Sequence, residues 1–372
     1  MVSGIIENQR IPSYPPVFDF TGYPVALARL YRLHAPGLAA IHADLENHAA
    51  GQDGVLAGTP GSVIVRRNAS GATFYVRQHY DALRLKRDRY LAGPVGSPEA
   101  DSIAGHWRRR IAEANDAIRS AKMLLREGYL GLEPKPFAAI APLVDHGLFA
   151  GGAVLVGSHA FGAIANKLGI GVSAFPTEDI DIARPQALKI ASDAAGGLLG
   201  LLRRSGIDFV EVPGLEPGAP PTAFKEAGRS RFRVDLLAPA AGREVTVRKV
   251  PELGAHASAL PHLGFLTAIA QPGIALSHHG VAAIRIPLPE RFAIHKLVVS
   301  ELRTGRSAKS AKDLRQAAIL LAACAELFPG SLEEAWKDLP PAARRAARAG
   351  LAKALPMLGS HADAAEALSG LA

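Results

Sequence analysis

The chain has 372 residues, of which 48% are apolar and 20% charged, a composition typical of a folded globular protein and not of a disordered chain. At about 150 residues per domain, this length favours two or three structural units. Lysine and arginine number 42 against 34 for aspartate and glutamate, so the net charge is +8 and an anionic partner is weakly favoured. The single cysteine, Cys324, excludes an intrachain disulfide and is typical of a reducing, cytoplasmic compartment.

Targeting and membrane segments are not expected. The first ten residues lack a basic stretch followed by an apolar core, so no secretory signal is predicted. Two uncharged stretches, residues 147–165 and 254–284, are near or above the length of a membrane helix. Glycines and histidines interrupt both, and prolines interrupt the second, so neither is predicted to span a bilayer.

The N-terminal part is expected to contain a helical segment over residues 1–60, with one helix at 24–46. A small basic unit follows over residues 61–92, where alternating apolar residues and short turns predict three strands, at 62–67, 73–80 and 83–91.

Residues 61–91 hold seven basic and two acidic side chains, a local charge of +5, interleaved with four aromatic residues: Phe74, Tyr75, Tyr80 and Tyr90. Such a surface could bind RNA or another single strand. The alternative is an ordinary solvated sheet face with aromatic rings packed beneath it.

The rest of the chain divides into a helical connector, a core and a helical end. Apolar residues at three- and four-residue steps predict one helix over 101–128 within a connector at 100–139. Residues 140–288 alternate short strands and helices, which predicts an α+β core with a small mixed sheet. Residues 289–372 are expected to be a helical domain, with helices at 291–303 and 307–328 and an Ala-rich tail broken by prolines.

The first motif with chemical meaning is a glycine–serine pair between a predicted strand and a predicted helix. Residues 153–156 form a short apolar run that ends at Gly157 and Ser158, and one helical face follows. A glycine there lets a ligand approach the backbone, and free N–H groups at the start of the helix attract an anion. The alternative is that the pair simply caps the helix.

Two further segments carry carboxylates. In residues 177–183, the period of a strand places Asp179 and Asp181 on one face and two isoleucines on the other. In residues 231–237, Asp235 lies on the face opposite three apolar side chains. Carboxylates alone favour Mg²⁺ or Mn²⁺ over zinc. The alternatives are solvated aspartates on an edge strand and a salt bridge between Asp235 and a neighbouring arginine.

The order of these pieces, a strand, Gly–Ser, a helix, a D-x-D strand and a later strand with Asp, resembles the nucleotidyltransferase superfamily related to DNA polymerase β. The resemblance implies that Asp179, Asp181 and Asp235 bind two divalent ions, with Asp235 also assisting deprotonation of the acceptor hydroxyl. It further implies that an NTP such as ATP is bound by five residues: Gly157, Ser158, Thr177, Lys296 and Lys312. The expected reaction is transfer of NMP to an acceptor, with release of pyrophosphate.

Residues 152–183, 289–297 and 311–317, together with the basic strand unit that ends at Leu91, look more narrowly like a bacterial nucleotidyltransferase-like family. The gap between Ser158 and Asp179 is about twice that of the wider superfamily and leaves room for a flap over residues 169–175. Lys296 and Lys312 could equally be exposed helix lysines, with Lys312 paired to Asp313.

The acceptor is not fixed by the sequence: RNA, for example a tRNA end, a protein hydroxyl and a small antibiotic stay open. One rival is a non-catalytic RNA- or nucleotide-binding protein that keeps the fold. A glycosyltransferase is a weaker rival, because it explains neither Gly157–Ser158 nor Asp235.

The four histidines between residues 256 and 279 match no zinc spacing, and the chain has no Walker A, dinucleotide or G-x-S-x-G motif.

Overall fold

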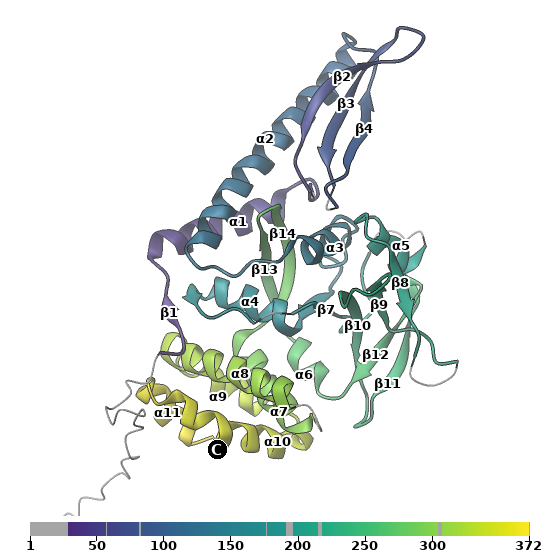
Figure 1. Cartoon of the computed structure of the whole chain (residues 1–372). Coiled ribbons are helices and arrows are strands. Elements are labelled where there is room, and N and C mark those ends of the chain that lie inside the picture. The colour runs from purple at the N-terminus through teal and green to yellow at the C-terminus, as the bar shows by residue number, and fades with distance from the viewer. Residues whose placement is uncertain are drawn as a thin grey trace, which may run out of the picture.

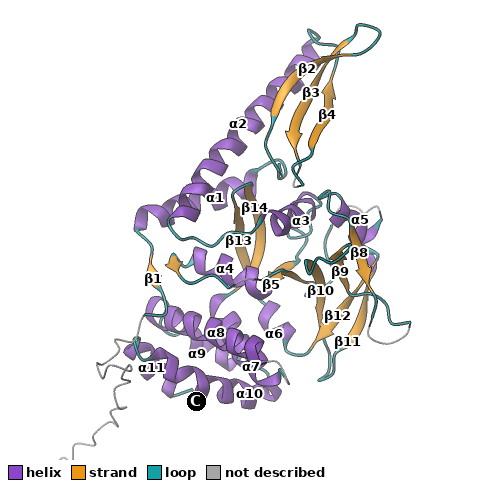
Figure 2. Cartoon of the chain, viewed as in Figure 1, coloured by secondary structure: helices purple, strands orange, loops and turns teal. Residues whose placement is uncertain are grey.

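The computed structural model describes residues 29–56, 58–81, 83–175, 177–190, 196–214, 218–303 and 307–371. They form an α+β structure with three parts: a central mixed sheet, a projecting arm of three strands and one long helix, and a layer of C-terminal helices (Figures 1 and 2). The predicted fold class is therefore confirmed.

The N-terminal helix lies later in the chain than predicted. The described part begins with β1 (Arg32–Leu33), which pairs antiparallel with β6 (Ile170–Gly171). Helix α1 (Pro36–Gly51) starts only at Pro36, whose ring is compatible with the first helical turn. The prediction of a helix over 24–46 is thus wrong for residues 29–35, because the chain there is extended by the pairing of residues 32–33 with a distant segment. Residues 24–28 lie outside the described part.

The arm contains β2 (Ser62–Arg67), β3 (Thr73–Tyr80) and β4 (Lys86–Ala92) as one antiparallel sheet in that order. The bounds of β2 and β3 match the prediction, but β4 starts three residues late. The reason is a turn in which the Asp81 carboxylate accepts hydrogen bonds from the N–H groups of Leu83 and Leu85, at 2.9 Å each. Arg84 adopts a positive φ of 61° in the same turn.

Helix α2 (Pro98–Arg126) packs along one face of this small sheet and runs back to the core (Figure 1). It starts three residues before the predicted position, because Ser97 accepts a hydrogen bond from the N–H of Ala100 and Pro98 occupies the first turn.

The central sheet has seven strands, with β11, β12, β10, β7 and β5 side by side, β9 paired with β10, and β8 paired with β9. Strand β10 runs parallel to both β7 and β12, whereas β5 is antiparallel to β7. The seven strands are β5 (Val154–Val156), β7 (Asp179–Ala183), β8 (Phe209–Val212), β9 (Ala223–Glu226), β10 (Arg233–Pro239), β11 (Thr246–Val250) and β12 (Ala255–Leu260).

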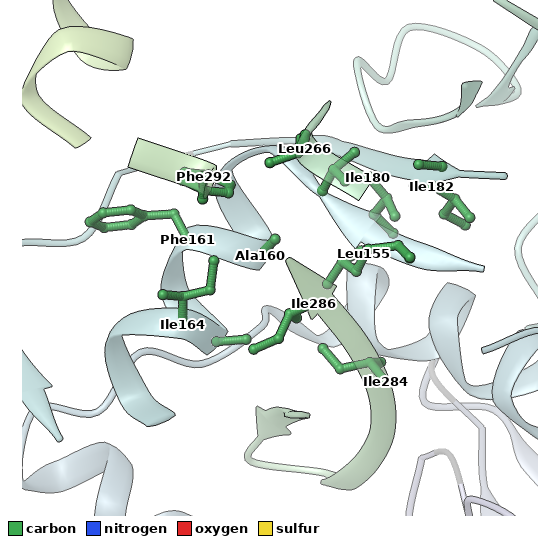
Figure 3. Packing of buried hydrophobic residues seen from close by; sticks show 14 of the residues in the cluster. Leu155, Ala160, Phe161, Ile164, Ile180, Ile182, Leu266, Ile284, Ile286 and Phe292 are labelled. Atoms are coloured by element: carbon green, nitrogen blue, oxygen red, sulfur yellow. The ribbon is translucent and has the colours of Figure 1, made fainter. Parts of the chain in front are cut away.

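Short helices and a hairpin surround this sheet. They are α3 (Pro134–Asp145), α4 (Gly157–Lys167), α5 (Gly197–Arg203), the 3-10 helix η1 (Pro251–Leu253), α6 (Leu263–Thr267) and the hairpin of β13 (Ala270–Ser277) and β14 (Gly280–Pro287). The main hydrophobic core joins these layers, and Figure 3 shows Leu155 of β5, Ile164 of α4 and Ile286 of β14 within it.

The C-terminal part is helical, as predicted. It contains α7 (Pro289–Leu302), α8 (Ser307–Leu327), α9 (Ser331–Lys337), α10 (Pro341–Ala354), the 3-10 helix η2 (Leu355–Leu358) and α11 (Ala362–Ser369). Phe292 of α7 reaches the core beside Phe161 of α4, so this layer is packed onto the central unit (Figure 3). None of the helices in the described ranges combines the length and apolar character needed to cross a bilayer.

Candidate active site

The glycine–serine pair lies where the sequence places it, between β5 and α4. Gly157 has a φ of +69°, in the region that favours glycine. A Cβ added to Gly157 would lie 2.0 Å from Oδ2 of Asp181, so the glycine allows the carboxylate to rest against the backbone. No side chain caps α4, so the alternative of Ser158 as a helix cap is wrong. Ser158 is half-buried at the first turn.

The D-x-D strand has the two faces that its pattern predicts. Ile180 and Ile182 are completely buried, while Asp179 and Asp181 point to the other face of β7. Thr177 lies just before this strand and is half-buried. The longer gap between Ser158 and Asp179 does not disturb β7, which is a regular strand. Within the predicted flap, residues 170–171 form β6 and pair with β1, and Phe175 packs edge-on against Phe161 with ring centres 5.2 Å apart.

The third carboxylate lies on the neighbouring strand, next to the other two. In the parallel pairing of β10 with β7, Asp235 is opposite Asp181 and Arg233 is opposite Asp179. Asp235 is only 8% exposed, so it does not point into bulk water. Three acidic residues from two segments more than 50 positions apart therefore share one sheet face beside Gly157.

Arg233 lies between these carboxylates. Its Nη2 donates to Oδ2 of Asp235 at 2.5 Å, and its Nε is 3.5 Å from Oδ1 of Asp179. The salt-bridge alternative for Asp235 is thus correct as well, and it coexists with the carboxylate cluster. A second cation, Nζ of Lys309 on α8, lies 4.0 Å from Oδ2 of Asp179. Arg233 provides a positive charge where the carboxylates would otherwise repel each other.

These cations do not prevent the pKa values of two of the carboxylates from rising. Burial raises the pKa of Asp235 to about 6; the charges of Asp181 and Asp179 raise it further, and Arg233 opposes the shift. Burial also raises the pKa of Asp181, against the attraction of Lys296. Two buried carboxylates with raised pKa values on one sheet face favour additional positive charge nearby, and such groups are typical of functional sites.

The donor chemistry suits a hard divalent cation, because the available ligands are carboxylate oxygens with a deficit of positive charge. In the side-chain arrangement of the described residues, however, no three His, Cys, Asp or Glu side chains are grouped so as to hold a metal ion. The Arg233 guanidinium is bonded to the carboxylate that would complete such a group. The residues therefore fit Mg²⁺ or Mn²⁺ in kind, on the condition that Arg233 moves away from Asp235.

Lys296 is buried rather than exposed. Its Nζ contacts Oδ1 of Asp313 at 2.5 Å and lies 5.3 Å from the centre of the Phe292 ring. Asp313 is 2% exposed and also pairs with Nε of Arg303 at 2.7 Å. The exposed-lysine interpretation of Lys296 and the exposed Lys312–Asp313 pair are both wrong, because α7 and α8 pack these groups together. Burial, then the charge of Lys296, lowers the pKa of the neighbouring Lys312.

Sequence reasoning did not identify His159 as a site residue. Its Nε2 is buried and has no hydrogen-bond partner among the described atoms. Burial, and then the charge of Lys312, lowers the pKa of His159 to about 4, so the imidazole is neutral at pH 7. Its position directly after Gly157–Ser158 was the available signal. Arg233 was expected only as a neighbour that could pair with Asp235, and its second contact, with Asp179, was not predicted.

We expect Gly157→Ala to displace the Asp181 carboxylate, whereas Gly147→Ala is the matched control. Both glycines have positive φ, +69° and +78°, but an added Cβ at Gly147 meets nothing within 4 Å. Each substitution should cost about 1–2 kcal/mol of stability from backbone strain. Only Gly157→Ala should also reduce nucleotide binding, measured by titration calorimetry at a temperature where both variants are folded. Equal nucleotide affinity in the two variants would show that the contact between Gly157 and the Asp181 carboxylate has no role in nucleotide binding.

The mixed sheet, the glycine turn at Gly157 and the three aspartates on one sheet face define a nucleotidyltransferase-type α+β protein. Residues 137–340 match the model of a protein family described as nucleotidyltransferase. The match covers more than half of the 372 residues, so the chain belongs to this nucleotidyltransferase family. No curated protein and no solved structure matches the chain.

Proposed function

We propose that this protein transfers NMP from an NTP to an acceptor hydroxyl and releases pyrophosphate, with Mg²⁺ or Mn²⁺ as the metal. The observation that carries the proposal is the register of β7 and β10, which puts Asp235 opposite Asp181 with Asp179 on the same face. Membership of the nucleotidyltransferase family supports NMP transfer in general. The metal, the nucleotide and the roles of the individual residues are the proposed part.

In this proposal Asp179, Asp181 and Asp235 would hold the cation, with Arg233 no longer bonded to Asp235. The cation would neutralise the phosphates and stabilise both the attacking and the leaving oxygen. Gly157 and Ser158 offer backbone N–H groups and a hydroxyl to the phosphates at the start of α4. Thr177 is half-buried and lies two residues before Asp179 of β7.

The reaction joins the acceptor oxygen to the α-phosphorus and breaks the bond from this phosphorus to the pyrophosphate oxygen. The proton of the acceptor hydroxyl passes to the Asp235 carboxylate. A carboxylate at this position can act as the general base for that proton. The pyrophosphate carries the electron pair of the broken bond away.

The lysines of the helical layer supply positive charge at the nucleotide side of the site. Lys309 is 52% exposed and 4.0 Å from Asp179, so it can reach a phosphate, and Lys312 lies three residues further along α8. Lys296 is held by Asp313 and acts through its charge on Asp181 rather than through an exposed contact. We therefore assign Lys296 a positioning role in the nucleotide site.

The test is release of pyrophosphate, measured with each of the four NTPs and Mg²⁺, with transfer of labelled NMP as a second readout. The wild type should release pyrophosphate in a metal-dependent manner. The variant Asp179→Asn with Asp181→Asn should fall to the level of a reaction without protein. The control is Asp208→Asn, whose carboxylate is 77% exposed and which precedes β8, a strand separated from β10 by β9. Equal turnover in the wild type and the double variant would contradict the proposal.

A non-catalytic nucleotide-binding protein is the second candidate, favoured by the Arg233 bridge between two of the three carboxylates. A permanent guanidinium there would replace the metal and leave a binding site without turnover. In that case nucleotide affinity would be unchanged by EDTA, and no NTP would yield pyrophosphate. A fall in nucleotide affinity after removal of the metal would instead favour the enzyme.

A further inference from the structure

The arm of the molecule has one covered sheet face and one open face. Helix α2 covers the first through a small cluster that includes Tyr75, Ala92 and Ala104. Trp107 of α2 extends this contact, with the guanidinium carbons of Arg77 and Arg89 lying 5.8 Å and 5.2 Å from its ring centre. Figures 1 and 2 show no described element along the other face of β2, β3 and β4.

Almost all of the net charge of the protein lies on this arm. Residues 61–126 hold thirteen lysines and arginines against six aspartates and glutamates, a net charge of +7 out of +8 for the whole chain. The remaining residues are nearly neutral in sum. A projecting element with this concentration of positive charge attracts a polyanion.

The open face combines aromatic rings with cations. Cross-strand pairing puts Arg66 beside Phe74, and Lys86 beside Tyr80, on the same face as Tyr90. Tyr90 is 62% exposed and Tyr80 is 49% exposed, and the Tyr90 ring lies 5.7 Å from that of Phe74. The one acidic residue on this face, Asp88, is paired with Arg66 at 2.8 Å and with Gln78 at 3.1 Å. The face therefore presents rings and positive charge together.

We propose that the open face of β2–β3–β4 binds a single strand of nucleic acid, and that this strand is the acceptor of the reaction proposed above. Bases would stack on Tyr80 and Tyr90, while Arg66 and Lys86 would contact backbone phosphates. Exposed rings suit unpaired bases, whereas a regular duplex hides them. An acidic protein segment would match the positive charge, but it would leave the two exposed tyrosine rings without a stacking partner. The identification of the strand as acceptor rests on the proposed function; its binding to the arm does not.

The binding test uses fluorescence anisotropy of the full chain with a labelled single strand of about 15 nucleotides, as RNA and as DNA. Tyr80→Ala with Tyr90→Ala should weaken binding by at least about tenfold, and Tyr90→Phe should retain it because the ring is kept. The control is Arg248→Gln with Lys249→Gln, an exposed basic pair on β11. Lys86→Gln should reduce the slope of affinity against salt concentration by roughly the release of one counterion.

Preference for RNA over DNA would identify a hydroxyl-bearing RNA strand, and equal affinity would identify single-stranded nucleic acid as a class. Several results would overturn the proposal: no binding at low salt, an equal loss in the β11 control, no effect of the tyrosine variants, or full competition by polyglutamate at equal charge. Pyrophosphate release is measured separately, with the strand present and with it absent. No release under either condition, with intact strand binding, would refute the proposed function and leave the binding surface standing.

Discussion

Lys296→Met is expected to lower the free energy of unfolding by about 3 kcal/mol, because it leaves the Asp313 carboxylate buried with one partner in place of two. Lys296 and Asp313 are both less than 10% exposed, so water cannot replace the lost contact. Arg303 still pairs with Asp313, which keeps the loss at the lower end for a broken buried ion pair. Urea unfolding followed by circular dichroism measures the difference.

The matched control is Lys296→Met combined with Asp313→Leu, which removes both buried charges. This double variant should recover most of the stability, because apolar side chains of similar volume can replace a buried ion pair at little cost. Its pyrophosphate release should stay low if the Lys296 charge acts on Asp181 as proposed. A single variant as stable as the wild type would show that the pair contributes nothing, and full activity in the double variant would remove Lys296 from the site.

The sequence was most informative about features with a local period. Alternation and short turns predicted β2 and β3 to the residue, and alternation put Ile180 and Ile182 on the face opposite the two aspartates of β7. The predictions that were wrong depended on partners distant in the chain. Residues 32–33 form a strand because Ile170 and Gly171 lie beside them, which no pattern within residues 24–46 could reveal.

The same distinction holds for the candidate site. That Asp235 and Arg233 share a strand face follows from residue spacing, but that Asp235 lies opposite Asp181 requires the parallel pairing of β10 with β7. The burial of Lys296 depends on the packing of α7 against α8, so its sequence neighbours gave no sign of the contact with Asp313. No sequence pattern marked His159, and only the burial of its unpartnered Nε2 draws attention to it.

Asp235→Asn is expected to stabilise the protein at pH 8 in the presence of EDTA, by about 2–3 kcal/mol. The folded state holds the Asp235 proton more tightly than the unfolded chain, with a pKa raised to about 6 from the ordinary 3.8. Stability contributed by this carboxyl is therefore fully present below about pH 4 and is lost as the pH rises through 6. Asparagine mimics the protonated form at every pH. The gain should accordingly vanish near pH 4 and grow up to about pH 7.

Urea unfolding of the two proteins at pH 4, 6 and 8 measures this difference, with Asp208→Asn as the exposed control that should show no such trend. Mg²⁺ with an NTP analogue should stabilise the wild type and have much less effect on Asp235→Asn, because a ligand that binds only the folded state raises its stability. A gain independent of pH, or a loss at pH 8, would show that Arg233 already balances the carboxylate. A variant that is more stable without metal and inactive with it would indicate that the buried charge is maintained for function at the expense of stability.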